Sequence, residues 1–151
     1  MQYLLLMVVL TAADQLLKLL VLGTVGMSGQ IPVIDHFFYI SVIPNNGIAM
    51  GMLANHQPLV IACTSLIMLA IAVYIFIKRK EEKPRMLVVL SVIVAGGAGN
   101  IIDRIRLGYV VDYLDFRVWP YIFNFADICI VAGCFVLVFL LYMDSRKTAE
   151  K

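Results

Sequence analysis

Four long apolar segments, at approximately 2–22, 59–77, 86–106 and 125–143, dominate this chain of 151 residues. Each is close to the length of about 20 helical residues that crosses the hydrocarbon core of a bilayer. Only 15% of the residues are charged, whereas a soluble domain carries about 25%. We therefore expect an all-α membrane protein with four transmembrane helices. Residues 1–151 are expected to form a single integral membrane domain, because no stretch is left for a separate soluble domain.

Basic residues are unevenly distributed among the connections between these segments. The connection at 78–85 carries five of them and the C-terminal tail three more, whereas the connections at 23–58 and 107–124 hold only Arg117. The positive-inside rule therefore predicts that the basic connection and both termini are cytoplasmic. The other two connections are then external. In the first of them, the β-branched and aromatic stretch at 31–43 predicts one or two strands at the outer membrane surface.

In this orientation the polar residues of the spans gather near the outer surface. Asp14 and Lys18 share one face of the first helix, about 12 and 6 Å below its outer end. Asn100, Asp103 and Arg104 lie at the outer end of the third span, where Asn100 shares a face with both others. The inner halves of all four spans are apolar. Convergence of acids, amides and cations at one depth indicates a site, because each polar group costs free energy there.

Two aspartates frame the start of the last apolar segment. Asp112 lies in the preceding connection, and Asp127 lies in the first turn of the span, with Asn124 three residues before it. A carboxylate at a bilayer boundary is unfavourable unless it is paired, protonated or hydrated. Two carboxylates in different environments can act as an acid–base pair that activates water. The pattern predicts an intramembrane aspartyl hydrolase, although spacing alone does not distinguish Asp112 from Asp115.

Several of these polar residues also have structural interpretations. Asp14 and Lys18 form a plausible ion pair within one helix, and structural support is favoured over direct chemistry for them. For Asp103 we favour a local ion pair with Arg104. The Asn-Asn-Gly sequence at 45–47 is also typical of a simple turn.

Other hydrolytic chemistries lack the residues they need. The chain has no His-Glu-x-x-His motif for zinc and no Gly-x-Ser-x-Gly motif. His36 and His56 lie outside the spans and lack the spacing of metal ligands, and the three cysteines lie in apolar stretches. We expect neither a metal nor an organic cofactor.

Two non-hydrolytic functions are alternatives to this interpretation. A small proton-coupled transporter also uses intramembrane acids and lysine. It predicts polar residues through the full depth of the membrane or a two-repeat layout, and neither pattern is visible. A non-catalytic subunit of a membrane assembly gives no reason for paired acids at one depth.

Five ordered motifs, taken together, resemble the bacterial lipoprotein signal peptidases, the signal peptidase II family. They are Asp-Gln-x-x-Lys at 14–18, Asn-Asn-Gly-Ile-Ala-Met-Gly at 45–51, Gly-Gly-Ala-Gly-Asn-x-x-Asp-Arg at 96–104, Gly-Tyr-Val-Val-Asp-Tyr at 108–113 and Phe-Asn-Phe-Ala-Asp at 123–127. Met50 departs from the Phe or Trp usual in the family, and Asn46 from the common Thr. Both departures lie in the external connection and bear on substrate fit rather than chemistry.

The resemblance implies an aspartic endopeptidase that removes the signal peptide from diacylglyceryl-modified prolipoproteins, cutting before the lipid-modified cysteine. It assigns the catalytic carboxylates to Asp112 and Asp127. It assigns substrate-binding or supporting roles to a further set: Asp14, Lys18, Asn45, Gly47, Asn100, Arg104 and Asn124. The implied location is the bacterial cytoplasmic (inner) membrane, with the site facing the extracytoplasmic side. The expected partners are prolipoproteins and membrane lipid, without nucleic acid, and the expected state is a monomer.

Overall fold

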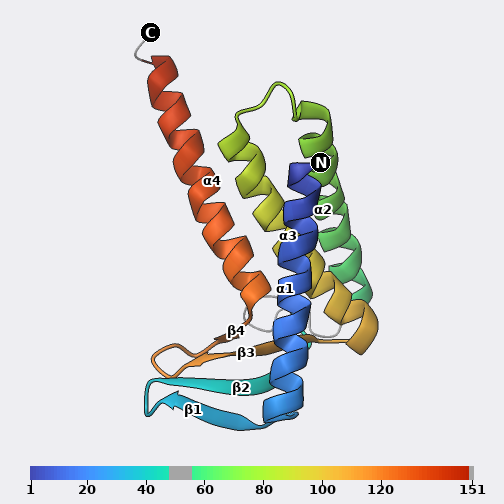
Figure 1. Ribbon diagram of the computed structural model, residues 1–151, viewed down its shortest axis with the longest axis vertical. Coiled ribbons are helices and arrows are strands. Elements are labelled where there is room, and N and C mark those ends of the chain that lie inside the picture. Colours follow the sequence, from blue (N-terminus) through green and yellow to red (C-terminus); the bar gives the residue numbers. More distant parts are fainter. Residues whose placement is uncertain (48–55, 150–151) are drawn as a thin grey trace.

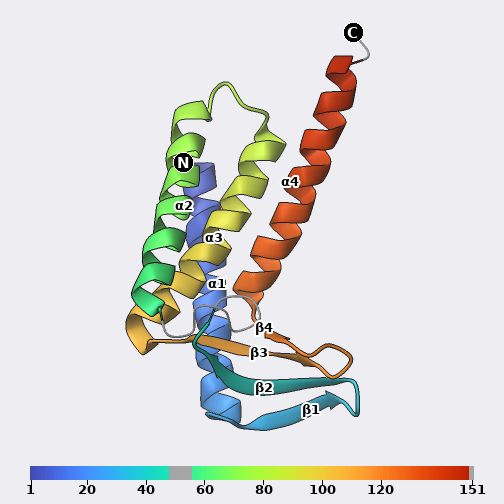
Figure 2. The ribbon, with the colours of Figure 1, turned by 180° about the vertical axis from the view of Figure 1, so that it is seen from behind.

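The computed structural model describes residues 1–47 and 56–149, and the later part of the motif at 45–51, including Met50, lies outside the described residues. Four helices, α1 (Gln2–Val25), α2 (Gln57–Lys78), α3 (Pro84–Leu107) and α4 (Phe125–Ala149), are long and apolar enough to cross a membrane. They stand side by side, with a small sheet across one end and the connection between α2 and α3 at the other (Figures 1 and 2). The prediction of a four-helix membrane fold is confirmed.

Helix α3 is the central element of the bundle. In its most apolar stretch 67% of the residues are buried, against 11% to 17% in the other three helices. α1, α2 and α4 therefore direct most of their apolar side chains outward, as expected for helices that face lipid. α3 starts with Pro84 in its first turn and ends at Gly108, whose φ of 82° is the left-handed conformation that favours glycine.

The four strands form one antiparallel sheet in the order β1 (Gln30–Ile34), β2 (Phe38–Asn45), β3 (Val110–Phe116), β4 (Ile122–Phe123). The β-containing first connection is thus confirmed, with two strands. Strands β3 and β4 in the second connection are additional to the predicted ones. These strands exist because β3 pairs with β2, a partner distant in sequence whose position only the packed bundle decides.

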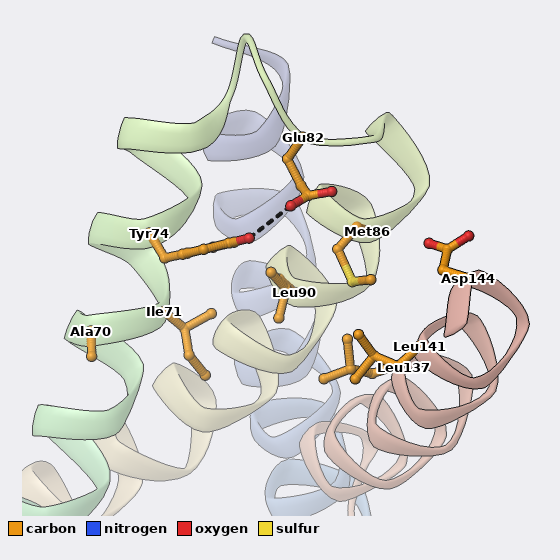
Figure 3. Close-up of a pocket in the computed structure, with 9 residues that line it drawn as sticks. All are labelled: Ala70, Ile71, Tyr74, Glu82, Met86, Leu90, Leu137, Leu141 and Asp144. Carbon is orange, nitrogen blue, oxygen red and sulfur yellow. Dashed lines mark hydrogen bonds between the residues drawn. The ribbon is translucent and has the colours of Figure 1, made fainter. Parts of the chain in front are cut away.

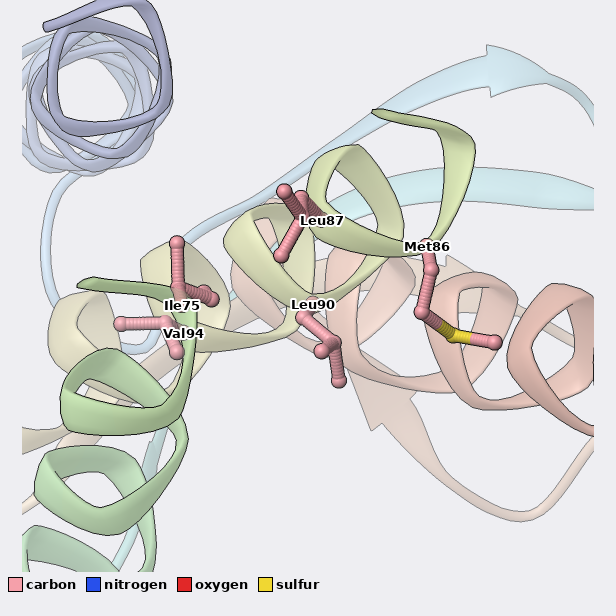
Figure 4. Close-up of a cluster of buried hydrophobic side chains, with 5 residues drawn as sticks. All are labelled: Ile75, Met86, Leu87, Leu90 and Val94. Atoms are coloured by element: carbon pink, nitrogen blue, oxygen red, sulfur yellow. The ribbon is translucent and has the colours of Figure 1, made fainter. Parts of the chain in front are cut away.

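The bundle end opposite the sheet contains a cavity and a buried apolar cluster. The cavity lies over α3 between α2 and α4 (Figure 3). Next to it, the buried side chains Ile75, Met86, Leu87, Leu90 and Val94 pack together (Figure 4). This cluster joins α2 to α3, and partly buried Leu137 and Leu140 extend the packing to α4. The buried charged residues of the bundle lie toward the sheet, so the apolar cluster stabilises the bundle without entering the candidate site.

Candidate active site

Asp127 belongs to a reciprocal cap at the start of α4. The backbone N–H of Asp127 donates to Oδ1 of Asn124 at 2.9 Å, and the backbone N–H of Asn124 donates to Oδ2 of Asp127 at 3.2 Å. This is the capping-box arrangement, which satisfies two helix N–H groups that would otherwise lack a partner. The spacing Asn-x-x-Asp at 124–127 signals such a cap. The cap fixes the Asp127 carboxylate in the first turn of the helix, next to the end of the sheet.

Asn124 also connects Asp127 to Asp112. Its side-chain Nδ2 donates to Oδ1 of Asp112 at 2.6 Å. Asn124 is fully buried and Asp112 is 3% exposed, so the bond lies away from bulk water. One asparagine thus bonds to both carboxylates that the motifs single out. Asp112 lies on strand β3 rather than in an irregular connection, and the strand places it next to Asn124, just before α4.

The second oxygen of Asp112 is held from the other external connection. Asn45, the last residue of β2, donates from Nδ2 to Oδ2 of Asp112 at 2.8 Å. Its Oδ1 accepts the N–H of Gly47 at 2.9 Å, and the carbonyl of Gly47 accepts a hydrogen bond from Arg104 at 2.8 Å. The predicted residues Asn45, Gly47 and Arg104 are therefore linked in series to Asp112.

Burial has a direct electrostatic consequence for Asp112. Removal from water, followed by the nearby charge of Asp127, raises the pKa of Asp112 from 3.8 to about 7. Hydrogen bonds from Asn45 and Asn124 act in the opposite direction, because they stabilise the carboxylate form. Asp112 therefore titrates near neutral pH rather than in the acidic range of an ordinary carboxyl group, and the charge of Asp127 contributes to this shift of its pKa.

A buried ion cluster supports Asp127 from the side of α1. Lys18 lies 2.9 Å from Asp14 and 2.9 Å from Asp103, with all three side chains at most 3% exposed. Lys18 also donates to Oδ1 of Asn100 at 3.1 Å, and Nδ2 of Asn100 donates to Asp127 at 2.8 Å. The predicted residues of the first and third spans thus lie together in one network that ends on Asp127.

Asp103 does not form the expected local ion pair with Arg104. Its ion pair is with Lys18 on α1, and no pair with its neighbour Arg104 is present among the described residues. One of its oxygens accepts the N–H of Val111 at 3.1 Å, and the other accepts a hydrogen bond from Gln15 at 2.9 Å. Adjacent residues on a helix point about 100° apart, which favours partners on other elements over a local pair. Asp103 therefore joins α1 to the start of β3.

Two residues with such bracing contacts were not among the predicted site residues. They are Asp103, for which the sequence predicts only a local pair, and Gln15. Gln15 donates to Asp103 and to the carbonyl of Gly99 at 3.2 Å, and accepts from Arg106 at 3.2 Å. The only sequence signal for Gln15 is its place in the motif at 14–18.

Asp14 stabilises the same helix end as Asn124. Its Oδ1 accepts the backbone N–H of Ala126 at 3.0 Å. An anionic side chain at this position complements the free N–H groups and partial positive charge at a helix N-terminus. Asp14 also lies against Gly99, where any side chain would collide with its carboxylate. The start of α4 is therefore fixed from α1.

Asp115, the alternative carboxylate, has different surroundings. It is 7% exposed and accepts a hydrogen bond from Ser41 at 2.7 Å. It also lies 3.4 Å from Arg117. None of its described polar contacts reaches Asn124 or Asp127, so the geometry favours Asp112 as the partner of Asp127. The described residues contain no cluster of three metal-ligating side chains.

The chain is similar to known proteins over most of its length. The family model described as signal peptidase (SPase) II matches residues 6–143. The chain is 36% identical to the lipoprotein signal peptidase of Clostridioides difficile, over 97% of this chain and 99% of that protein. It is 38% identical to that of Moorella thermoacetica, over 100% and 99% of the two chains.

Solved structures show the same architecture. A protein described as a bacterial membrane enzyme superposes with a TM-score of 0.88 at 33% identity, covering 99% of this chain and 93% of that one. A second one gives a TM-score of 0.80 at 34% identity, covering 93% and 92%. These likenesses favour a protease over the transporter and assembly-subunit alternatives. The chain belongs to the signal peptidase II family of bacterial membrane aspartic endopeptidases.

Proposed function

We propose that this signal peptidase II uses Asp112 and Asp127 as a catalytic dyad to remove signal peptides from diacylglyceryl-modified prolipoproteins. The observation that carries the assignment is the double contact of Asn124, which bonds to Asp112 and to Asp127 at the same time. The lipoprotein signal peptidases to which the chain is similar support the substrate class. We further propose that residues 1–151 act as one protease domain, as a monomer.

The proposed chemistry uses one proton shared between the two carboxyl groups. The ionised carboxylate takes a proton from a water molecule. The oxygen of that water attacks the carbonyl carbon of the peptide bond before the lipid-modified cysteine. The protonated carboxyl group hydrogen-bonds to the carbonyl oxygen, where negative charge develops. When the tetrahedral intermediate collapses, the C–N bond breaks and a proton passes to the amine of the cysteine. The dyad titrates as a unit, so the two roles belong to the pair.

The other predicted residues then have supporting roles. We propose that Asn124 and Asn45 hold Asp112, and that Asn100, Lys18 and Asp14 hold Asp127 and the start of α4. Arg104 and Gly47 position Asn45 and contribute to the surface that meets the substrate. Buried partners of this kind keep the reacting groups in place, which lowers the entropic part of the activation barrier.

We also propose the orientation of the enzyme in the inner membrane. The connection at 78–85, with five basic residues, lies at the opposite end of the bundle from the sheet. The positive-inside rule favours a cytoplasmic position for that connection. The dyad then opens to the extracytoplasmic side, where the signal helix and the acyl chains of the substrate both lie in lipid.

The proposal is tested by cleavage of a purified diacylglyceryl-modified prolipoprotein in detergent. Asp112→Asn and Asp127→Asn are expected to lower the rate by at least about 100-fold, since each removes an acid–base group. Asp115→Asn is the matched control, because Asp115 lies on the same strand and is similarly buried. Full activity in Asp112→Asn together with loss in Asp115→Asn would move the dyad to Asp115. If the wild type does not cleave the prolipoprotein, the proposed substrate class is wrong.

A further inference from the structure

The cavity at the end of the bundle opposite the sheet has no role in the proposed reaction. Its volume is about 490 Å³, within the range of about 300–1,000 Å³ common for small-molecule sites. Met86 and Leu90 of α3 form its floor, and Ile71 of α2 faces Leu137 and Leu141 of α4 across it (Figure 3). The inner part of the cavity is therefore apolar and suits a hydrocarbon chain.

The position of the cavity gives lipid direct access to it. α4 diverges from α2 toward its C-terminal end (Figures 1 and 2), and the cavity lies between them. Tyr74 and Leu141, on the two walls, are 40% and 53% exposed. Both belong to helices that are long and apolar enough to cross a membrane. The exposed wall residues therefore face the bilayer.

The charged residues that line the mouth of the cavity are the acids Glu82 and Asp144, and the basic residues Lys83 and Arg85 pair with Asp144. Tyr74 donates to Glu82 at 2.8 Å, and Asp144 is paired with Lys83 at 2.7 Å and Arg85 at 2.5 Å. The acids at the mouth are thus engaged. The side chains of Lys83 and Arg85 remain 54% and 46% exposed, which leaves donors available to a ligand.

The charge balance favours an anionic ligand at this mouth. The connection at 78–85 holds five basic residues against Glu81 and Glu82, a net charge of +3. Basic segments next to membrane spans attract anionic lipid headgroups. An apolar cavity open to the bilayer, with two exposed basic side chains beside its mouth, matches the acyl chain and the phosphate of such a lipid. A soluble metabolite or a peptide has no need of the lateral opening.

We propose that this cavity binds one acyl chain of an anionic phospholipid, whose phosphate is held by Lys83 and Arg85. The ligand is a membrane lipid rather than the substrate, because the cavity lies at the opposite end of the helices from Asp112 and Asp127. The inference does not depend on the proposed reaction.

Native mass spectrometry of the purified full chain tests the proposal. The protein is titrated in detergent with dioleoylphosphatidylglycerol and, separately, with dioleoylphosphatidylcholine, which has the same acyl chains. We expect one phosphatidylglycerol to bind at least about fivefold more tightly, because each basic residue near an anionic lipid favours binding by about this factor. Equal binding of the two lipids would overturn the assignment of the headgroup.

Paired variants separate a bound lipid from lipid that coats the whole protein. Leu137→Trp fills the cavity and is expected to abolish the tight site, whereas Val138→Trp, a neighbouring residue that does not line the cavity, is expected to retain it. Equally tight lipid binding by the two variants would show that the lipid does not bind in the cavity. If Leu137→Trp fails to fold, as judged by its melting temperature, Met86→Phe provides a second test, and this variant is also expected to lose the tight lipid site.

The headgroup contact has its own matched pair. The double variant Lys83→Gln/Arg85→Gln removes the two cations at the mouth, and Arg79→Gln/Lys80→Gln removes the same charge from the same connection. The first is expected to lose the preference for phosphatidylglycerol and the second to keep most of it. An equal loss in both would mean that overall charge, and not this site, selects the lipid.

Discussion

Lys18 donates a hydrogen bond from Nζ to Oδ1 of Asn100, 3.1 Å away. Because lysine has no acceptor, this contact requires the amide oxygen of Asn100 to face it. The Nδ2 of Asn100 is then directed to Oδ1 of Asp127, which it reaches at 2.8 Å. A buried cation on α1 thus orients the amide that holds a proposed catalytic carboxylate on α4.

Lys18→Met is expected to destabilise the protein by about 3–5 kcal/mol, because it leaves Asp14 and Asp103 buried without their cation. The double variant Lys18→Met/Asp103→Asn is expected to recover part of this loss. The measurement is the free energy of unfolding in mixed detergent micelles. Lys78→Met is the control, since the exposed pair of Lys78 with Glu81 is screened by water and contributes little to stability. A similar effect of the two single substitutions would contradict the proposed role of the buried cluster.

Replacement of Asn124 separates its two contacts. Asn124→Ser keeps a cap oxygen for the N–H of Asp127 but is too short to reach Asp112. The cleavage rate is expected to fall by about 10- to 100-fold, as for loss of a hydrogen bond to a charged group of about 1.5–3 kcal/mol. Asn124→Ala loses the cap as well, and its stability should be lower than that of Asn124→Ser by about 1 kcal/mol. Equal stability of the two variants would show that the cap is unimportant.

The pH dependence of kcat/KM should report the proton held by the dyad. Since the pKa of Asp112 is raised to about 7, kcat/KM is expected to decline as the pH rises above about 7, where the proton is lost. The hydrogen bond from Asn45 lowers this pKa. Asn45→Ala should therefore move the alkaline decline to higher pH. Asp115→Asn is the control and should leave it in place; a shift to lower pH in Asn45→Ala would refute the assignment.

The same pKa difference predicts the pH dependence of stability. Between about pH 4 and pH 7 the folded protein retains the Asp112 proton that the unfolded chain releases. The free energy of unfolding should therefore decrease as the pH rises through this window. Asp112→Asn cannot titrate at this position, so its stability is expected to decline less. The melting temperatures of the wild type and of Asp112→Asn are compared at pH 4.5 and pH 7.5, about the two ends of this window. An equal decrease of the melting temperature in both proteins would contradict the prediction.

Gly99→Ala is expected to lower both stability and activity. The added Cβ would collide with the carboxylate of Asp14, which bonds to the start of α4, and overpacking of this kind costs about 1–3 kcal/mol. Gly23→Ala on α1 is the matched control, because a Cβ there meets nothing within 4 Å. Its stability should be unchanged or higher, by up to about 1 kcal/mol. Melting temperature and cleavage rate are compared for both variants, and an unaffected Gly99→Ala would show that α3 and α1 have room to separate.

Some features of the fold were predictable because they depend on local sequence. Runs of about 20 apolar residues form helices wherever they enter a bilayer, since every backbone polar group must be satisfied internally. This accounts for the agreement between the predicted spans and α1 to α4. The spacing of Asp14 and Lys18 on one helix face likewise follows from helical geometry alone, and the two are indeed paired.

The motifs also carried information that no single residue could supply. The resemblance to a family assigns the catalytic carboxylates to Asp112 and Asp127. The spacing of the residues alone does not distinguish Asp112 from Asp115. The tertiary structure separates the two candidates by their partners, Asn124 for Asp112 and Ser41 for Asp115. Strand β3 gives them different partners, because it pairs with β2, which carries Ser41, and brings Asp112 to Asn124, just before α4.

The sequence by itself determined the four helices, the strands of the first external connection and the depth at which the polar groups gather. These follow from hydropathy, helical periodicity and the cost of placing charge in lipid. Only the tertiary structure decided that Asp103 pairs with Lys18, that β3 and β4 complete the sheet, and that Asn124 joins the two aspartates. These contacts connect residues on different elements, and their partners are chosen when the helices and the sheet pack together.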